Sequence, residues 1–308
     1  MDAPEPKIAN SPPALSVTDV SSLKAGAIVP MLCAVACYAG TDAMVKWLSG
    51  TLSIMEITFF RSVFTFIPVA FVVYRSGGLG SLRTDQWGLH TIRAALGAAA
   101  MIAFFVAYQH LPLPDVATLG QTYPLALVAL AGPLLGEVPD RRQAIATAFG
   151  FLGVLIIVAP VDGFSFQVWH LLPLIGSLCL ALNLILLRRL SARETQSSLI
   201  LYTPLLTAII TGATLPWSWT IPASGAEWWL LAAMGIFGGI AFFLRNVAYS
   251  RAPASELAPI EYTQILFASL LSIVVFGSTP SLHLIAGATL IIGSNAWLAH
   301  VQASRKGG

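Results

Sequence analysis

The chain has 308 residues, of which 56% are hydrophobic and only 10% are charged, and its mean hydropathy is +0.79. A soluble domain carries about 25% charged residues and cannot bury so large an apolar fraction, so a soluble fold and intrinsic disorder are both excluded. A formal net charge of +2 with scattered basic residues also excludes a nucleic-acid-binding surface. The composition therefore predicts an all-α, polytopic membrane protein.

The first 24 residues contain many Pro, Ser and Ala residues and no apolar core of a signal peptide, so we expect a disordered tail over 1–24. Beyond this tail the chain contains runs of about 20 mostly apolar residues, the length that spans a bilayer as a helix. These runs predict ten transmembrane helices, in chain order 27–48, 54–74, 88–109, 115–135, 143–160, 169–187, 198–215, 228–248, 256–276 and 283–300. A short tail follows at 301–308.

Lysines and arginines are distributed unevenly over the connections between these helices. If the N-terminus is cytoplasmic, the segments on its side of the membrane hold twelve of the sixteen, and the connections on the other side hold none. Because basic residues concentrate in cytoplasmic loops, we predict an inner-membrane protein with both termini in the cytoplasm. The cysteines lie in apolar segments and the histidines at helix ends, so we expect no disulfide, metal or cofactor.

The sequence contains an internal repeat. A shift of 141 residues aligns 87–139 with 228–280 without a gap, and fourteen of the 53 positions are identical. Each half of the chain, 25–160 and 169–300, then holds five helices. Because five is odd, the second half enters the membrane with the opposite orientation. Inverted repeats of this kind are typical of secondary transporters, whose substrate site lies near the bilayer midplane between the repeats.

Short motifs follow one another in a regular order along both halves. They are Asp42-Ala-Met-Val-Lys46, Glu56-Ile-Thr-Phe-Phe-Arg61, Arg93, Pro112-Leu-Pro-Asp-Val-Ala117, Leu-Leu-Gly136-Glu137, Ala258-Pro-Ile-Glu261-Tyr262-Thr263 and Phe276-Gly277. In order and spacing they resemble the EamA-type drug/metabolite transporter superfamily over about residues 25–300, and the first half resembles its S-adenosylmethionine and riboflavin uptake carriers. The resemblance implies two inverted five-helix repeats around a central cavity. The sequence departs from the family pattern at Ser278, where a glutamate usually follows the glycine.

Ionisable side chains inside a membrane helix are costly and are therefore functional candidates. Counted from the turn near 50–53, Asp42 and Arg61 both lie about 12 Å deep, and Lys46 and Glu56 about 4–6 Å deep. We therefore expect two level pairs, Asp42–Arg61 and Lys46–Glu56. This cluster would bind a zwitterion or gate the cavity mouth; the alternative is a structural ion-pair network that fixes the helical hairpin.

Glu261 lies well inside its helix and is the sharpest single candidate. An unpaired carboxylate at this depth would carry a coupling proton or hold a substrate amine. The alternative is a carboxylate satisfied by Arg245 or by a hydroxyl group. Arg245 and Arg93 lie near helix ends, where either would clamp a carboxylate or phosphate, or extend its charged group to the membrane surface.

Polar side chains also lie near the middle of the fourth and ninth helices, at positions that the repeat relates. Gln121 and Tyr123 in the fourth helix match Tyr262 and Gln264 in the ninth, and Asn183 in the sixth helix matches Asp42. Two roles are consistent with these residues: contact with the substrate, and ordinary hydrogen bonding between helices.

The sequence shows no phosphate-binding loop, metal motif or nucleophile–base set, so we predict that the protein is not an enzyme. We predict a secondary transporter that moves a small polar or amphipathic organic metabolite (S-adenosylmethionine, riboflavin or amino-acid-like) by alternating access. The alternatives are an amino-acid or drug exporter of the same fold and, in other classes, a membrane enzyme acting on lipid-linked substrates or an assembly subunit. Proton coupling and the choice between monomer and homodimer remain open.

Overall fold

The computed structural model describes residues 17–75, 78, 82, 84–135, 141–158, 167–191, 194–220, 222, 224–251, 260–278 and 280–306. Within these residues the chain forms helices joined by turns, and none of them forms a strand. The predicted all-α class is therefore confirmed. The Gly136-Glu137 motif and the residues 258–259 of the second-half motif lie outside the described residues.

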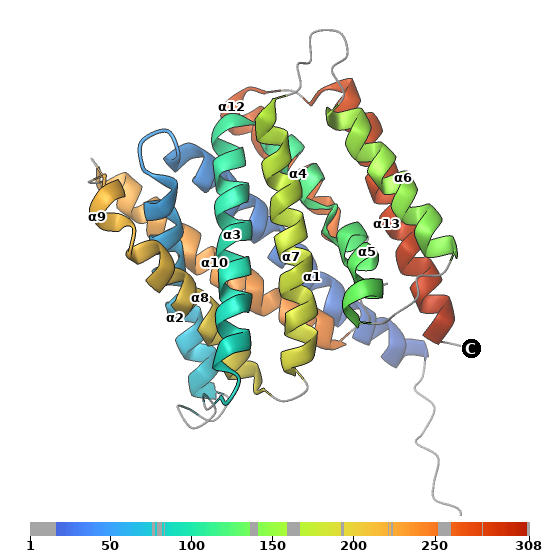
Figure 1. Ribbon diagram of the computed structural model, residues 1–308, viewed down its shortest axis with the longest axis horizontal. Helices are drawn as coiled ribbons and strands as arrows, with labels where there is room; N and C mark the ends of the chain where they lie inside the picture. The colour runs from blue at the N-terminus through green and yellow to red at the C-terminus, as the bar shows by residue number, and fades with distance from the viewer. Residues whose placement is uncertain are drawn as a thin grey trace, which may run out of the picture.

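The helices follow the predicted order along the chain (Figure 1). The first repeat contains α1 (Val17–Leu48), α2 (Ile54–Arg75), α3 (Trp87–His110), α4 (Leu113–Gly120), α5 (Tyr123–Leu135) and α6 (Arg141–Val158). The second contains η2 (Val168–His170), α7 (Leu171–Ser191), α8 (Gln196–Gly212), α9 (Leu215–Ser218), α10 (Gly225–Arg251), α12 (Thr263–Phe276) and α13 (Leu282–Lys306). Among the described residues, five helical stretches are long and apolar enough to cross a membrane, and the other apolar helices are shorter.

Both chain ends are more helical than their hydropathy suggests. α1 begins at Val17, inside the segment 1–24 for which we expected a disordered tail, while residues 1–16 lie outside the described part. α13 continues to Lys306, through most of the expected tail at 301–308. Residues 301–306 contain neither Gly nor Pro, so nothing in them ends a helix even though the apolar run has stopped.

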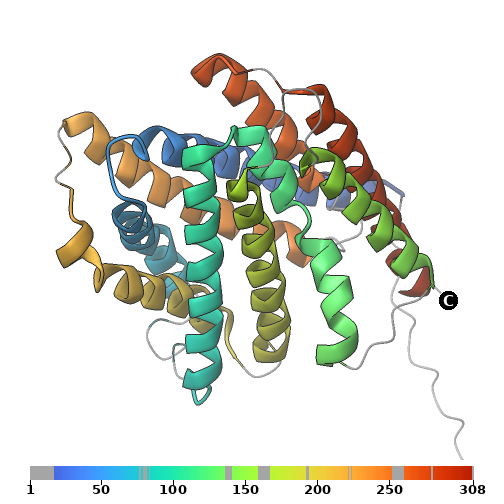
Figure 2. The same ribbon diagram turned by 45° about the horizontal axis from the view of Figure 1, so that its top comes forward.

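The helices pack in pairs that the repeat relates to one another. α1 packs against α10, and its repeat partner α7 packs against α3. α2 packs against its own partner α8 at one side of the molecule, and α6 packs against α13 at the opposite side (Figures 1 and 2). This twofold pattern of contacts is what two similar five-helix repeats produce.

Glycines allow two of these helix pairs to approach closely. A Cβ atom placed on Gly287 of α13 would lie 2.6 Å from the carbonyl oxygen of Gly153 in α6. A Cβ atom on Gly235 of α10 would lie 2.3 Å from Cβ of Phe64 in α2. Both contacts are too short for any side chain, so these interfaces depend on the small residues that membrane helices use for close packing.

Two of the predicted helices, 115–135 and 256–276, are interrupted near their middle. In the first, α4 ends at Gly120 and α5 begins at Tyr123, so that α4 and α5 appear as separate segments in Figure 2. In the second, the chain turns at Tyr262 before α12 begins. A shift of 141 residues superposes these breaks, because Tyr262 is the repeat partner of Gln121.

The breaks have a local cause and a structural consequence. Gly120 and Pro124 flank the first break, and both residues weaken the hydrogen bonding of a continuous helix. Irregular backbone at membrane depth is tolerated where protein or a cavity surrounds it, and transporters use discontinuous helices of this kind to build binding sites. The paired breaks therefore mark the centre of the molecule as the place to look for a site.

The largest buried apolar cluster fills the end of the molecule that contains the turn between α1 and α2. We call it the hairpin-end core, and its most buried members include Val45, Leu48, Leu52, Ile57, Leu111, Leu113, Leu231 and Met234. Smaller apolar clusters lie elsewhere, one of them around Val69, Val73 and Ile200. The hairpin-end core thus closes one end of the space between the repeats.

Candidate transport site

A cavity of about 370 Å³ lies between the two repeats, at the lower end of the size range of small-molecule sites. Its wall is formed by α1 to α5 of the first repeat and by α7, α8, α10 and α12 with the residues before it of the second. Eight of the predicted site residues line it: Asp42, Arg61, Arg93, Gln121, Tyr123, Asn183, Arg245 and Glu261. Lys46, Glu56 and Tyr262 do not, and the Tyr262 side chain is buried.

Glu261 stands at the centre of a polar network that joins the repeats. Its Oε1 lies 2.7 Å from Nη2 of Arg245, and its Oε2 accepts a hydrogen bond of 2.6 Å from the Tyr123 hydroxyl. Arg245 also donates to the Tyr123 oxygen at 3.1 Å, and the Tyr38 side chain lies close to its guanidinium. The structure therefore agrees with the second expectation for Glu261: Arg245 and a hydroxyl group are the partners of its carboxylate.

A second network connects the two helix breaks directly. Nε2 of Gln121, at the first break, donates to Oε1 of Gln264 at 3.3 Å. Nε2 of Gln264, just after the second break, donates to Oδ2 of Asp42 at 3.0 Å, and the Tyr108 side chain lies close to the same carboxylate. Gln264 and Tyr108 were not among the predicted site residues, although the repeat alignment already pairs Gln264 with Tyr123.

Arg61 does not form the expected ion pair with Asp42. Among the described residues, no carboxylate oxygen lies within the 4.0 Å ion-pair distance of its guanidinium. Instead, its Nη1 contacts Sδ of Met101 and its guanidinium lies over the Phe105 ring, 5.5 Å from the ring centroid. Both charges line the cavity, as their equal depth predicted, but Asp42 accepts a hydrogen bond from the neutral Gln264 side chain and Arg61 contacts α3.

Lys46 and Glu56 also differ from the expected pair, because each binds backbone groups instead. Nζ of Lys46 donates to the carbonyl oxygens of Tyr108 and Leu111, at 3.0 and 2.5 Å, where the end of α3 leaves carbonyls unpaired. Glu56 is fully buried, and its Oε2 accepts from the backbone N–H of Thr220 at 3.0 Å. Both side chains therefore fix helix ends next to the hairpin-end core.

Arg93 and Asn183 form a third group, on the opposite side of the cavity from the hairpin-end core. Arg93 is buried and does not extend to the surface; its Nη1 donates to the carbonyl oxygen of Leu199 in α8 at 2.9 Å. Asn183 of α7 donates through Nδ2 to the Arg93 carbonyl oxygen at 2.6 Å. These bonds tie α3 to both α7 and α8.

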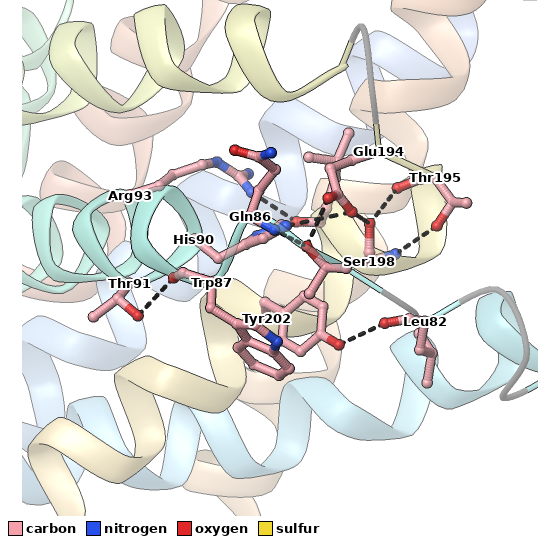
Figure 3. Close-up of polar contacts among 12 residues, drawn as sticks. Leu82, Gln86, Trp87, His90, Thr91, Arg93, Glu194, Thr195, Ser198 and Tyr202 are labelled. Atoms are coloured by element: carbon pink, nitrogen blue, oxygen red, sulfur yellow. Dashed lines mark hydrogen bonds and ion pairs between the residues drawn. The ribbon is translucent and has the colours of Figure 1, made fainter.

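A polar cluster that the sequence did not indicate lies beside Arg93 (Figure 3). We call it the Glu194 cluster. Oε1 of Glu194 accepts from the Thr84 hydroxyl at 2.6 Å, and Oε2 accepts from the Ser198 hydroxyl at 2.9 Å. Nε2 of His90 lies 3.6 Å from Oε2 of Glu194. The Tyr202 ring packs against His90, with ring centroids 4.8 Å apart.

The Glu194 cluster fastens the connection before α3 and the connection after α7 to one another. Burial alone would raise the pKa of the Glu194 carboxyl, but the hydrogen bonds from Thr84 and Ser198, together with the nearby His90 side chain, outweigh it and lower the pKa below its ordinary value. Ser198 lies four residues after Glu194, but Thr84 lies 110 residues before it, so no local sequence pattern could reveal the whole cluster.

The comparison with protein families decides the identity of the chain. The model of the EamA-like transporter family matches residues 25–159 and 167–299. This chain belongs to the EamA-like transporter family. The predicted resemblance is therefore confirmed, and so is the prediction of a multi-pass membrane transporter that is not an enzyme.

Several relatives in this family have names that state a substrate. The chain is 30% identical to a riboflavin transporter of Brucella anthropi over 87% of this chain and 96% of the relative. It is 28% identical to a pseudopaline exporter of Pseudomonas aeruginosa (88% and 94%) and 24% identical to an S-adenosylmethionine uptake transporter of Rickettsia felis (86% and 89%). A solved crystal structure shares the fold, with a TM-score of 0.65 and 20% identity over 91% of this chain and 97% of that one.

Proposed function

We propose that this EamA-family transporter is a secondary carrier that moves a small polar or amphipathic organic metabolite across the inner membrane by alternating access. The observation that carries the proposal is the cavity between the repeats, lined by charged and polar side chains from both and bordered by the paired helix breaks. A site built in this way can be exposed to either side when the repeats exchange their contacts.

The two ends of the cavity differ in a way that supports alternating access. The hairpin-end core closes one end with packed apolar side chains. Near the other end, the Glu194 cluster joins the helices through hydrogen bonds, which water can replace when the helices separate. With both termini in the cytoplasm, as the basic residues favour, the hairpin-end core faces the outside and the Glu194 cluster faces the cytoplasm.

The named relatives support an organic metabolite as the substrate but differ in the direction of transport. Two are named for riboflavin transport and for S-adenosylmethionine uptake, and a third is named as a pseudopaline exporter. We propose a substrate of comparable chemistry, with a polar part that binds the charged wall and an apolar part that lies against the aromatic wall. An exporter of amino acids or drugs would use the same cavity in the opposite direction.

The test is transport by the full chain in proteoliposomes. Labelled riboflavin, S-adenosylmethionine and amino acids are offered on either side of the membrane, with and without a pH gradient. We expect at least one of them to cross, and Glu261→Gln to lower its rate about tenfold or more because that change breaks the network between the repeats. Asp85→Asn, an exposed change, is the matched control. The proposal is contradicted if no metabolite crosses the membrane, or if Glu261→Gln transports at the wild-type rate.

A further inference from the structure

We propose that Arg61 is the docking point for a negatively charged group of the substrate, a carboxylate or another oxyanion of similar size. The transported metabolite would then carry such a group beside an apolar or aromatic body. The inference rests on the proposed function, since it assigns one part of the same cavity.

Arg61 is a half-buried cation without a close counter-charge in the described part of the chain. It lines the cavity, and among the described residues no carboxylate oxygen lies within 4.0 Å of it. Asp42 is near enough to act on it electrostatically, but the Asp42 carboxylate accepts a hydrogen bond from Gln264. A guanidinium without a close counter-charge is unfavourable at membrane depth, and a bound anion would supply the missing charge.

One edge of the guanidinium carries a hydrogen-bond donor without a partner in the part of the chain that the structure describes, in the arrangement that a carboxylate binds. Nε of Arg61 is buried and has no hydrogen-bond partner among the described residues. Nε and Nη2 form one edge of the planar group, the edge that binds the two oxygens of a carboxylate side by side. A Cβ atom on Gly238 would lie 3.3 Å from both nitrogens, so the backbone of α10 lies beside this edge and any side chain at position 238 would crowd it.

The surroundings of Arg61 hold the guanidinium in place and suit an apolar substrate body. Its plane lies over the Phe105 ring and its Nη1 contacts Met101, which restricts the side chain before any ligand arrives. Phe104 and Phe242 line the same cavity. Small-molecule sites combine apolar and aromatic walls with a few polar groups in this way.

The other cations of the cavity wall are engaged differently. Arg245 is paired with Glu261 at 2.7 Å, and Arg93 donates to the carbonyl oxygen of Leu199. Arg93 also keeps an Nε that has no partner among the described residues, but it lies beside the Glu194 cluster at the other end of the cavity (Figure 3). Arg61 is therefore the cation that we assign to the substrate anion.

Two probes with one skeleton test this subsite: 3-phenylpropanoate, which is anionic at neutral pH, and the neutral 3-phenylpropanamide. The full chain is purified into lipid nanodiscs and the affinity of each probe is measured by calorimetry. We expect the wild type to bind the carboxylate about tenfold to hundredfold more tightly, the size of a hydrogen bond to a charged group. Equal affinity for the two probes, or no binding of either, overturns the proposal.

The variants separate the charge of Arg61 from its geometry. Arg61→Gln should abolish the preference for the carboxylate, and Arg61→Lys, which keeps the charge without the two-nitrogen edge, should weaken it. Gly238→Ala keeps the arginine but places a methyl group against that edge, and should weaken the preference too. Arg75→Gln, an exposed change on the same helix, and Gly40→Ala, which meets open space, should leave it intact. A preference that survives Arg61→Gln refutes the assignment.

Transport assays then test the Arg61 subsite and the proposed function separately. If proteoliposomes move a neutral or cationic metabolite and Arg61→Gln leaves that transport unchanged, the carrier proposal stands and the Arg61 subsite is refuted. If the carboxylate preference depends on Arg61 but no metabolite crosses the membrane, the subsite stands and the carrier proposal fails.

Discussion

Replacing Glu261 by Gln removes one charge at the point where side chains of both repeats meet. The substitution keeps the shape of the side chain and an oxygen for the Tyr123 hydroxyl, but it leaves Arg245 without the carboxylate that lies 2.7 Å away. Breaking a buried ion pair costs about 3–5 kcal/mol because the remaining charge is uncompensated. The Arg245 side chain is 27% exposed, so partial solvation reduces the loss, and we expect about 2–3 kcal/mol.

The assay is thermal unfolding of the purified chain in one fixed lipid or detergent. A loss of that size lowers the unfolding temperature by about 4–10 °C for a protein of this length. Arg245→Gln and the double variant complete a double-mutant cycle, in which we expect a coupling energy of about 1.5–3 kcal/mol between the two residues. Asp85→Asn removes an exposed carboxylate and is the control for loss of charge alone.

Two outcomes would refute this reasoning. One is a Glu261→Gln variant whose stability lies within about 0.5 kcal/mol of wild type, the range of ordinary surface substitutions. The other is a cycle in which the two single effects add, since additive effects indicate residues that do not interact. Either result would mean that Glu261 and Arg245 are not held together as the structure shows them.

Three further changes test separate contacts. Lys46→Met removes the donor to two carbonyls at the end of α3 and should cost about 1–3 kcal/mol in thermal unfolding, with much of this recovered by Lys46→Arg; no loss contradicts the capping role. Gly287→Ala forces α6 and α13 apart and should cost about 1–3 kcal/mol, whereas Gly293→Ala meets open space; equal effects contradict the tight packing. The pKa of Glu194 is lowered by folding, so its carboxylate stabilises the protein above the ordinary glutamate pKa of about 4, and this contribution is lost as the pH falls through the lower folded value. Glu194→Gln should therefore be less stable than wild type at pH 7 and equal to it in acid; a difference independent of pH contradicts the Glu194 cluster.

Hydropathy predicted the bounds of a helix accurately where a turn lies at each end of a long apolar run. The expected helix 54–74 is observed at Ile54–Arg75, and 88–109 at Trp87–His110. It could not reveal the breaks at Gln121 and Tyr262, because an average over about 20 residues hides a turn of one or two. The repeat nevertheless drew attention to both positions, since it aligned two polar triplets at equal depth.

Depth along a helix predicted which charges would share a region, but not which would touch. Asp42 and Arg61 do line one cavity, yet the amide of Gln264, 222 residues from Asp42 in the sequence, binds Asp42 instead. Lys46 donates hydrogen bonds to carbonyl oxygens at the end of α3, and the pattern of charged residues in the sequence could not predict this contact. Unpaired backbone groups at helix ends compete for side chains, and the sequence alone does not show where those ends meet.

Alternating access to the cavity is the central claim, and labelling of a single cysteine tests it most directly. Thr203 lines the cavity near the middle of α8, and Thr203→Cys is a small change there. It is made in a chain whose native Cys33, Cys37 and Cys179 are replaced, and sealed vesicles are treated with a membrane-impermeant thiol reagent on one side at a time. The account predicts labelling from either side while the vesicles remain impermeable to the reagent. Labelling from one side only, or from neither, would contradict it.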